Sequence, residues 1–381
     1  MLEAAEADAA HQAILSGWVS QGPQVAAFER EFAAFVGAAH ACAVSNCTTA
    51  LHLALVAAGI GPGDEVITAS HSFIATANCI RYCGATPVFA DVDRATYNLD
   101  PNSVAAAITD RTRGIIVVHQ MGMPCDLVAL CALASQHNLI LIEDAACAAG
   151  SEIRIDGQWE RIGKARGAIA CFSFHPRKVI TTGEGGMLTT NDPELDRKFK
   201  LLRQHGMSVP DTVRHGSPQV IFEEYLTVGF NYRMTDIQAA IGRRQLERLP
   251  TLVAQRRALA SRYVELLANI EGLELPCEPD WARSNWQSYC VRLPDRLDQK
   301  RVMQNLLNQG VSTRRGIMCS HREAPYFESN QHGLRQSELA QDHSILLPLY
   351  AQMTESDQDC VAKALKLELK GLKCHQAEKA G

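Results

Sequence analysis

The chain has 381 residues, a formal net charge of -5, and 46% hydrophobic and 21% charged residues. This length is enough for a large core and is typical of two or three domains. No long basic block and no alternation of basic and aromatic residues occurs, so composition disfavours a nucleic-acid partner and favours a small-molecule ligand.

The N-terminal stretch MLEAAEADAAHQAILSGW places three acidic residues ahead of any apolar run and lacks the basic start of a secretory signal. No apolar stretch approaches the roughly 18 residues needed to cross a bilayer. We therefore expect a cytoplasmic protein without a membrane partner. The 13 cysteines are odd in number, scattered, and without a C-x-x-C pair, so we expect neither a disulfide framework nor a metal site.

From residue 40 to residue 190, short strand-like runs alternate with helical patterns such as TTALHLALVAAG (48–59) and DLVALCALASQHN (126–138). This alternation predicts an α/β fold in which helices flank a largely parallel sheet. Ligands of such sheets bind at the carboxyl ends of the strands. The strand-like runs are EVITAS (65–70), TPVFADV (86–92), GIIVVHQ (114–120), LILIEDA (139–145), AIACFSF (168–174) and GMLTTND (186–192).

A long amphipathic helix is predicted over residues 243–270, broken or bent near Pro250. After it the pattern changes to loops, a short strand and a helix that ends at a glycine. We therefore expect a large domain over residues 1–250 and a smaller α+β domain over residues 251–381. The last twenty residues are lysine-rich and predict a helix that frays.

The candidate chemistry lies after two of the predicted strands. Asp144 ends one strand-like run, and Lys178 follows a later run, ahead of a turn with three glycines. A lysine and a carboxylate at one sheet edge are the pair needed to hold pyridoxal phosphate. The amine bonds to the aldehyde, and the carboxylate keeps the ring nitrogen protonated. On the residues alone, Asp144 fits a helix cap equally well, and Lys178 fits a solvated loop residue.

Further polar residues supply what a phosphate group requires. Hydroxyls and free N–H groups at a helix N-terminus bind a phosphate dianion, although each of these residues also fits an ordinary cap, strand end or loop. The residues are Ser45, Thr48 and Thr49 ahead of a helical pattern, Ser173 five residues before the lysine, and Asn231 with Arg233 in a polar turn before a helix.

Nine segments, in order from about residue 17 to residue 250, resemble the successive motifs of the DegT/DnrJ/EryC1/StrS sugar aminotransferases, with weaker similarity in STRRGIM and HREAPY. The resemblance implies a PLP-dependent transferase of fold type I, with a mostly parallel seven-stranded sheet and a homodimer with shared active sites. It also implies L-glutamate as amino donor and a keto-sugar, linked to a nucleotide diphosphate, as acceptor. The segments are GPQVAAFEREFAAFVG, ALHLALVAAGIGPGDEVIT, SFIATANCI, GATPVFADVD, NLDP, VVHQMGMPCD, IEDAACAAGS, CFSFHPRKVITTGEGGMLTTND and GFNYRMTDIQAAIG.

The same resemblance implies a role for each candidate residue. Lys178 would bond to the pyridoxal phosphate aldehyde and shuttle the proton, and Asp144 would pair with the ring nitrogen. Phe73 would lie over the ring, although a core phenylalanine fits its position nearly as well, and His175 fits a packed histidine at least as well as a catalytic one. The remaining roles are phosphate binding by Thr48, Thr49 and Ser173, and a contact from Asn231 of the partner subunit.

Two positions depart from the family pattern. Cys47 stands where the family usually has glycine, so its side chain must point away from the phosphate turn. Cys147 replaces a glutamine that contacts cofactor or substrate, and Ala149 replaces the histidine that follows. A thiol cannot reproduce the hydrogen bonds of an amide, which leaves the contact at the cofactor's phenolic oxygen open and is consistent with a different substrate.

Alternatives remain open for the function. The acceptor could be a keto-inositol, or the chain could be a regulatory protein of the same fold without turnover. A dehydratase is disfavoured because Lys178 is present. Cations in two variable loops could meet a diphosphate, although such cations more often lie on solvated surface. They are Arg161, Lys164, Arg166 and Arg214.

Overall fold

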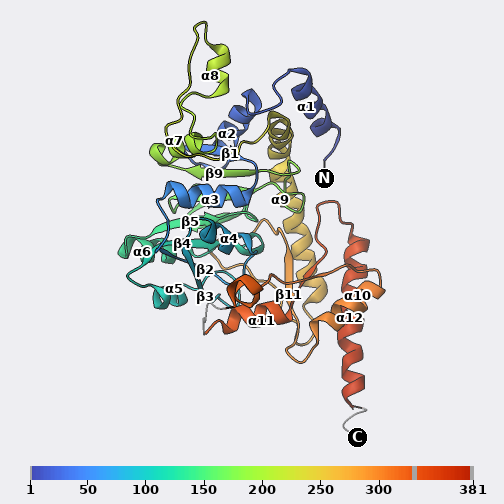
Figure 1. Cartoon of the computed structure of the whole chain (residues 1–381). Helices are drawn as coiled ribbons and strands as arrows, with labels where there is room; N and C mark the ends of the chain where they lie inside the picture. The colour runs from blue at the N-terminus through green and yellow to red at the C-terminus, as the bar shows by residue number, and fades with distance from the viewer. Residues whose placement is uncertain (1, 328–332, 378–381) are drawn as a thin grey trace.

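The computed structural model describes residues 2–327 and 333–377. Its centre is a seven-stranded sheet in the order β1-β9-β8-β5-β4-β2-β3 (Figure 1). Five neighbouring strands, β8 through β3 in this order, are parallel, whereas β9 runs antiparallel to β1 and β8. The mostly parallel sheet predicted from the sequence is confirmed. The strands are β1 (His40–Val44), β2 (Glu65–Ala69), β3 (Thr86–Ala90), β4 (Thr112–Val118), β5 (Ile140–Asp144), β8 (Ile169–Ser173) and β9 (Gly186–Thr190).

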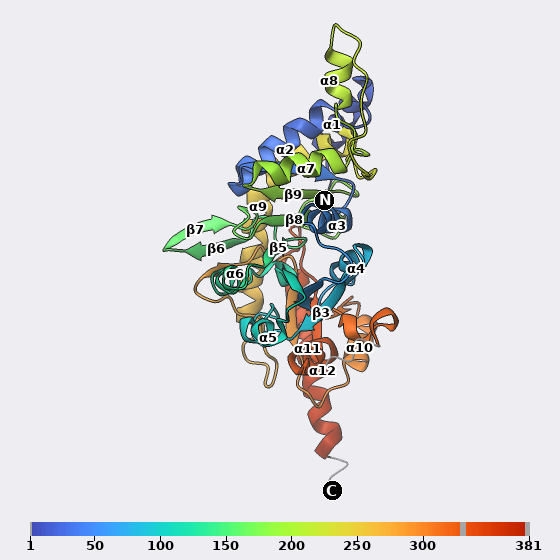
Figure 2. The ribbon, with the colours of Figure 1, turned by 60° about the vertical axis from the view of Figure 1, so that its left-hand side comes forward.

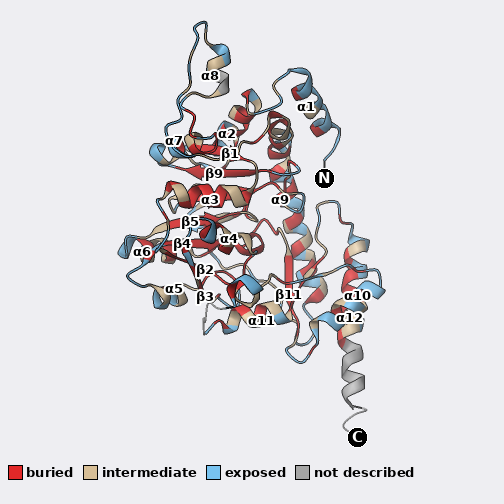
Figure 3. Ribbon diagram, viewed as in Figure 1, coloured by how far each residue is buried: buried red, intermediate tan, exposed pale blue. Residues whose placement is uncertain are grey.

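Two layers of helices cover the sheet, and the strands are buried on both faces (Figure 3). Successive residues of a strand enter different cores. Ile115 and Val117 pack in one core, and Ile116 packs in the other. This double burial explains the nearly continuous apolar runs. One face is covered by α2 (Pro23–Val36), α5 (Pro101–Ala107), α6 (Leu127–Gln136) and α9 (Asp236–Leu267), the other by α3 (Cys47–Ala57), α4 (Ala75–Tyr82) and α7 (Pro193–Leu202).

A second sheet, in the order β11-β13-β12, forms the centre of the smaller unit. The helix α9 runs continuously through Pro250, and its C-terminal part packs Tyr263 and Leu267 into the core of this unit. The predicted C-terminal helix is present as α12, while residues 378–381 lie outside the described residues. The elements are β11 (Tyr289–Arg292), β12 (Arg314–Arg315), β13 (Ser344–Leu347), α10 (Gln299–Asn308), α11 (Arg335–His343) and α12 (Glu355–Ala377).

The segment around α8 (Asp211–Gly216) projects away from the central sheet in both views (Figures 1 and 2). Across residues 2–327 and 333–377, the helices include none of the length and apolarity that a membrane span requires. The remaining elements are α1 (Ala4–Leu15), the sheet β10-β6-β7 of Ala282–Arg283, Glu152–Ile155 and Gln158–Arg161, and short 3-10 turns at Gln120–Gly122, Ser320–Arg322 and Ala324–Tyr326.

Candidate active site

A cavity of about 1130 Å³ lies where the carboxyl ends of the parallel strands meet the start of α3 and the smaller unit. Ligand pockets usually measure about 300–1,000 Å³, so this cavity has room for a cofactor together with a substrate. Most of the predicted site residues line this cavity, whereas Ser45, Asn231 and Arg233 do not. Those that line it are Thr48, Thr49, Phe73, Asp144, Cys147, Ser173, His175 and Lys178.

Asp144, the last residue of β5, is a buried carboxylate at the floor of the cavity. Its Oδ2 accepts a hydrogen bond from the Thr76 hydroxyl (2.8 Å), and its Oδ1 accepts one from the amide of Ala146 (3.1 Å). Burial raises the pKa of Asp144, although these two donors and the charge of Lys178 oppose that rise. A cation placed against the carboxylate would lower this pKa and favour the ionised form. The residue is therefore suited to hold a protonated ring nitrogen.

Lys178 lies in the turn after β8, and its Nζ donates a hydrogen bond to the Sγ of Cys147 at 3.1 Å. Burial opposes the charge on this amine, but the interactions with Cys147, Cys47 and Asp144 together outweigh burial, so that the pKa of Lys178 is raised. The thiol thus contacts the amine itself, at the position where the family has an amide. Condensation with an aldehyde requires the neutral amine, so Cys147 favours the form of Lys178 that does not react.

The first turn of α3 lines one part of the cavity. Asn46 caps the helix by accepting a hydrogen bond from the amide of Thr49 (2.9 Å), and the Thr49 hydroxyl donates to the Asn46 carbonyl (2.7 Å). Thr49 is thus engaged in the cap, whereas the hydroxyl of Thr48 has no hydrogen bond to a described residue. The helix dipole and the amides of Cys47 and Thr48 favour an anion here. Thr48 is consequently the better placed of the two threonines for phosphate.

The turn from Ser173 to Lys178 is held by local bonds. The Ser173 hydroxyl accepts from the amide of His175 (3.4 Å), and the Nδ1 of His175 accepts from the amide of Arg177 (3.2 Å). His175 therefore has a structural task. Among the glycines, Gly183 has a φ of +83°, and a Cβ at Gly186 would lie 2.5 Å from the backbone of Asn46. Glycine is thus required at both positions, and the second brings β9 against the start of α3.

Phe73 and Asn231 are exposed in the single chain. Phe73 lines the cavity with 66% of its surface exposed, so its ring has free area on the cavity side. Asn231 is also exposed but does not line the cavity, and its backbone bridges Gln204.

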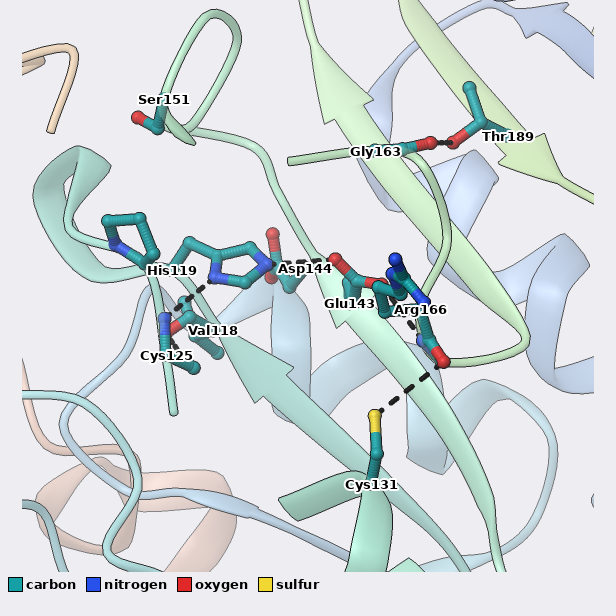
Figure 4. A network of polar contacts seen from close by, with 12 residues as sticks. Val118, His119, Cys125, Cys131, Glu143, Asp144, Ser151, Gly163, Arg166 and Thr189 are labelled. Atoms are coloured by element: carbon teal, nitrogen blue, oxygen red, sulfur yellow. Dashed lines mark hydrogen bonds and ion pairs between the residues drawn. The ribbon is translucent and has the colours of Figure 1, made fainter. Parts of the chain in front are cut away.

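Glu143 points to the opposite face of β5 and forms a buried network with His119 (Figure 4). Its Oε2 lies 3.1 Å from the Nε2 of His119, and its Oε1 accepts from the amide of Gly167 (3.1 Å). The Nδ1 of His119 accepts from the amide of Cys125 (3.0 Å), so Nε2 carries the proton that is donated to Glu143. The amide of His119 donates to the carbonyl of Asp144 (3.1 Å). This network fixes the strand end that carries Asp144.

The cavity is also lined by three arginines that were not predicted from the sequence. They are Arg177, Arg256 and Arg314. In contrast, the loop cations considered for a diphosphate do not line it. Lys164 and Arg166 form ion pairs with Glu160. The two others are engaged elsewhere as well, Arg161 at the carbonyl and ring of Phe35, and Arg214 in an ion pair with Glu223.

The donor set fits pyridoxal phosphate. An amine for the aldehyde, a buried carboxylate without a cation in contact, and a helix N-terminus with free amides line one cavity. Groups of three or more metal-ligating side chains are absent from the described residues. The arrangement defines a site for a cofactor that carries an aldehyde, a basic ring nitrogen and a phosphate.

The model of the DegT/DnrJ/EryC1/StrS aminotransferase family matches residues 1–366, and the chain belongs to this family. It is therefore an aminotransferase by family and by fold, as the sequence resemblance predicted. The chain is 40% identical to the spore coat polysaccharide biosynthesis protein SpsC of Bacillus subtilis over 93% of this chain and 92% of that protein. It is 42% identical to the GDP-perosamine synthase of Caulobacter vibrioides over 96% and 95% of the two chains.

Solved structures agree with this assignment. The aminotransferase TlmJ from Streptoalloteichus hindustanus superimposes with a TM-score of 0.90 at 34% sequence identity, covering 98% of each chain. The fold is thus that of the family's aminotransferases across nearly the whole chain.

Proposed function

We propose that this protein is a pyridoxal-phosphate-dependent aminotransferase that moves an amino group from L-glutamate to a keto-sugar carried on a nucleoside diphosphate. The observation that carries the proposal is the presence of Lys178, Asp144 and the start of α3 in one cavity. The two curated relatives support a sugar as the acceptor, because one is named for polysaccharide biosynthesis and the other for GDP-perosamine synthesis.

Pyridoxal phosphate, when bound, supplies an aldehyde that carries the amino group and a ring that takes up the electron pair of a broken C–H bond. Lys178 would hold the cofactor through its Nζ and, as a free amine, would take the proton from Cα of the donor. Asp144 supplies the negative charge that keeps the ring nitrogen protonated. The start of α3, with Thr48 and Ser173, binds the phosphate and so fixes the cofactor against Lys178.

The proposal includes a homodimer in which Asn231 acts in the partner's site. The segment that follows α8 exposes several apolar side chains, an arrangement that is unfavourable in water and favourable in a subunit interface. Asn231 follows this segment in the chain and does not line its own cavity, whereas Phe73 lines that cavity with 66% of its surface exposed. The exposed side chains are Val220 (84%), Phe222 (87%), Tyr225 (64%), Leu226 (60%) and Val228 (88%).

The half-reaction with L-glutamate tests the proposed activity. L-glutamate added to the cofactor-loaded protein should convert the visible absorbance of the cofactor to that of its amino form, with release of 2-oxoglutarate. Because general acid–base catalysis contributes about 10²- to 10⁴-fold, Lys178→Ala should lower the rate at least about 100-fold. Lys164→Ala, which removes an amine paired with Glu160, is the matched control and should keep the rate. An unchanged absorbance in the wild-type protein would contradict the proposal.

The acceptor is tested in the reverse direction. The amino form of the enzyme is mixed with nucleotide-linked 3-keto and 4-keto sugars and with keto-inositols. Recovery of the original absorbance with a nucleotide-linked sugar is the expected result. Recovery with keto-inositols alone would replace the sugar by a cyclitol as the acceptor.

Subunit mixing tests the shared site. Lys178→Ala and Asn231→Ala are each expected to be weakly active, and a mixed dimer of the two would contain one site with neither change. Activity should therefore recover on mixing if Asn231 acts across the interface. An absence of recovery, in a mixture shown by mass spectrometry to contain mixed dimers, would place Asn231 in its own site or outside catalysis.

A further inference from the structure

The active-site cavity is lined by more cations than carboxylates, although the chain as a whole has a net charge of -5. Asp144 and Glu184 are the acidic residues of the lining. A cleft with an excess of one charge attracts ligands of the opposite charge. The cavity therefore favours anionic ligands beyond the cofactor phosphate. The basic residues of the lining are Arg177, Lys178, Arg256 and Arg314.

Arg256 has a structural task. Its side chain is buried, and its Nη1 donates to the backbone carbonyls of Trp286 (3.0 Å), Gln287 (3.3 Å) and Leu349 (3.3 Å). Burial lowers the pKa of Arg256 from 12.5 to about 10. These bonds join α9 to the smaller unit, so this guanidinium is largely committed to the protein.

Arg314 is different because its guanidinium has no hydrogen bond or ion pair with any residue in 2–327 or 333–377. It is exposed and lies on β12, where its register partner is Leu346, another lining residue. Ser312, two residues earlier, lines the same cavity. Because both residues line the cavity, the Ser312 and Arg314 side chains are available to the same ligand.

The neighbouring Arg315 provides the contrast. It pairs in register with Ile345, does not line the active-site cavity, and lies 3.8 Å from Glu323 in an ion pair. Alternation along β12 thus separates two exposed arginines, one toward the cavity and one away from it. Both carry one charge and both are exposed, and they differ in direction and in the ion pair that Arg315 forms with Glu323.

We infer that Arg314, with Ser312, binds the phosphate groups of the acceptor substrate, an inference that rests on the proposed function. A guanidinium presents a planar fork of donors that matches phosphate oxygens, and an unpaired one has its donors available. The exposed position of Arg314 is suited to an acceptor whose sugar reaches Lys178 while the rest of the nucleotide extends toward solvent. Arg314 is thereby a specificity-determining residue and takes no part in proton transfer.

The test compares Arg314→Gln with Arg315→Gln in the cofactor-loaded protein. Dissociation constants for UDP, GDP and dTDP are measured by calorimetry, and the Michaelis constant for L-glutamate is measured from the cofactor absorbance in the absence of sugar. A charged hydrogen bond corresponds to roughly a tenfold to hundredfold change in affinity. We expect Arg314→Gln to raise the dissociation constant of the best-bound nucleoside diphosphate by about that factor. Arg315→Gln should leave this dissociation constant unchanged, and both variants should keep the wild-type Michaelis constant for L-glutamate.

Other outcomes overturn the inference. A higher Michaelis constant for L-glutamate with unchanged diphosphate affinity would assign Arg314 to a donor carboxylate. Equal losses in both variants would show a general effect of charge. Diphosphate affinity that is unchanged in Arg314→Gln, or absent from the wild-type protein, would remove the phosphate subsite. In each of these cases an intact L-glutamate half-reaction leaves the aminotransferase proposal standing, whereas failure of that half-reaction in the wild-type protein contradicts the proposal itself.

Discussion

His71 makes the stability of this protein sensitive to acid. The residue follows β2 and is fully buried, and neither ring nitrogen has a hydrogen-bond partner among the described residues. Burial lowers the pKa of His71 from 6.5 to about 4, with Asp91 opposing the change. Since the native state binds fewer protons than the unfolded state between these values, the free energy of unfolding falls as pH decreases through this window.

The size of the effect follows from the two pKa values. One pKa unit corresponds to about 1.4 kcal/mol, so His71 should lower the free energy of unfolding by about 3 kcal/mol between pH 7 and pH 4. In His71→Leu that contribution is absent. Urea denaturation of the wild-type protein and the variant at pH 7, 6, 5 and 4 measures the difference, and all other titrating groups cancel in it.

The difference in unfolding free energy between His71→Leu and the wild-type protein should grow toward low pH, mostly below pH 6.5. His137→Leu, at an exposed position after α6, is the control and should follow the wild-type curve. If the curves of His71→Leu and wild type run parallel from pH 7 to pH 4, the imidazole is not held neutral by burial and the reasoning fails.

Three further changes test the site. Asp144→Asn removes a carboxylate whose pKa is raised by burial. The raised pKa makes the cofactor-free wild-type protein less stable as pH rises, and the variant lacks this loss, so the variant should melt at a higher temperature than the wild-type protein at pH 7 but not in acid. Its L-glutamate half-reaction should slow about 100-fold or more. Cys147→Gln removes the thiol that raises the pKa of Lys178, so cofactor capture, followed by absorbance, should become faster at neutral pH; an unchanged pH profile would refute this. His119→Phe leaves Glu143 buried without its side-chain partner and should cost about 3–5 kcal/mol in urea denaturation, partly recovered in His119→Phe/Glu143→Leu; equal loss in the double variant would contradict the pairing.

The central pair of the site could be predicted because its signal is local. Asp144 and Lys178 each follow an apolar run, and parallel strands bring their carboxyl ends to one edge. The same holds for Thr48, because a helix start is visible as hydroxyl residues ahead of an apolar pattern. The sheet was predictable for a related reason, since burial on both faces makes its strands nearly continuous apolar runs.

Other features depend on tertiary packing that no short segment encodes. Arg314 belongs to a two-residue strand in a segment without clear periodicity, and only the approach of the smaller unit places it at the cavity. Arg256 lies within a long helix whose pattern does not reveal a buried arginine bonded to carbonyls. The contact between Lys178 and Cys147 joins residues 31 positions apart in the chain and is visible only in three dimensions.

The most direct test of the account is the covalent state of Lys178. The purified protein is saturated with pyridoxal phosphate, reduced with sodium borohydride, digested and analysed by mass spectrometry. We predict the mass of a phosphopyridoxyl group on Lys178 in nearly every chain and on no other lysine in comparable amount. An unmodified Lys178 under saturating cofactor, or the group on another lysine, would contradict the account.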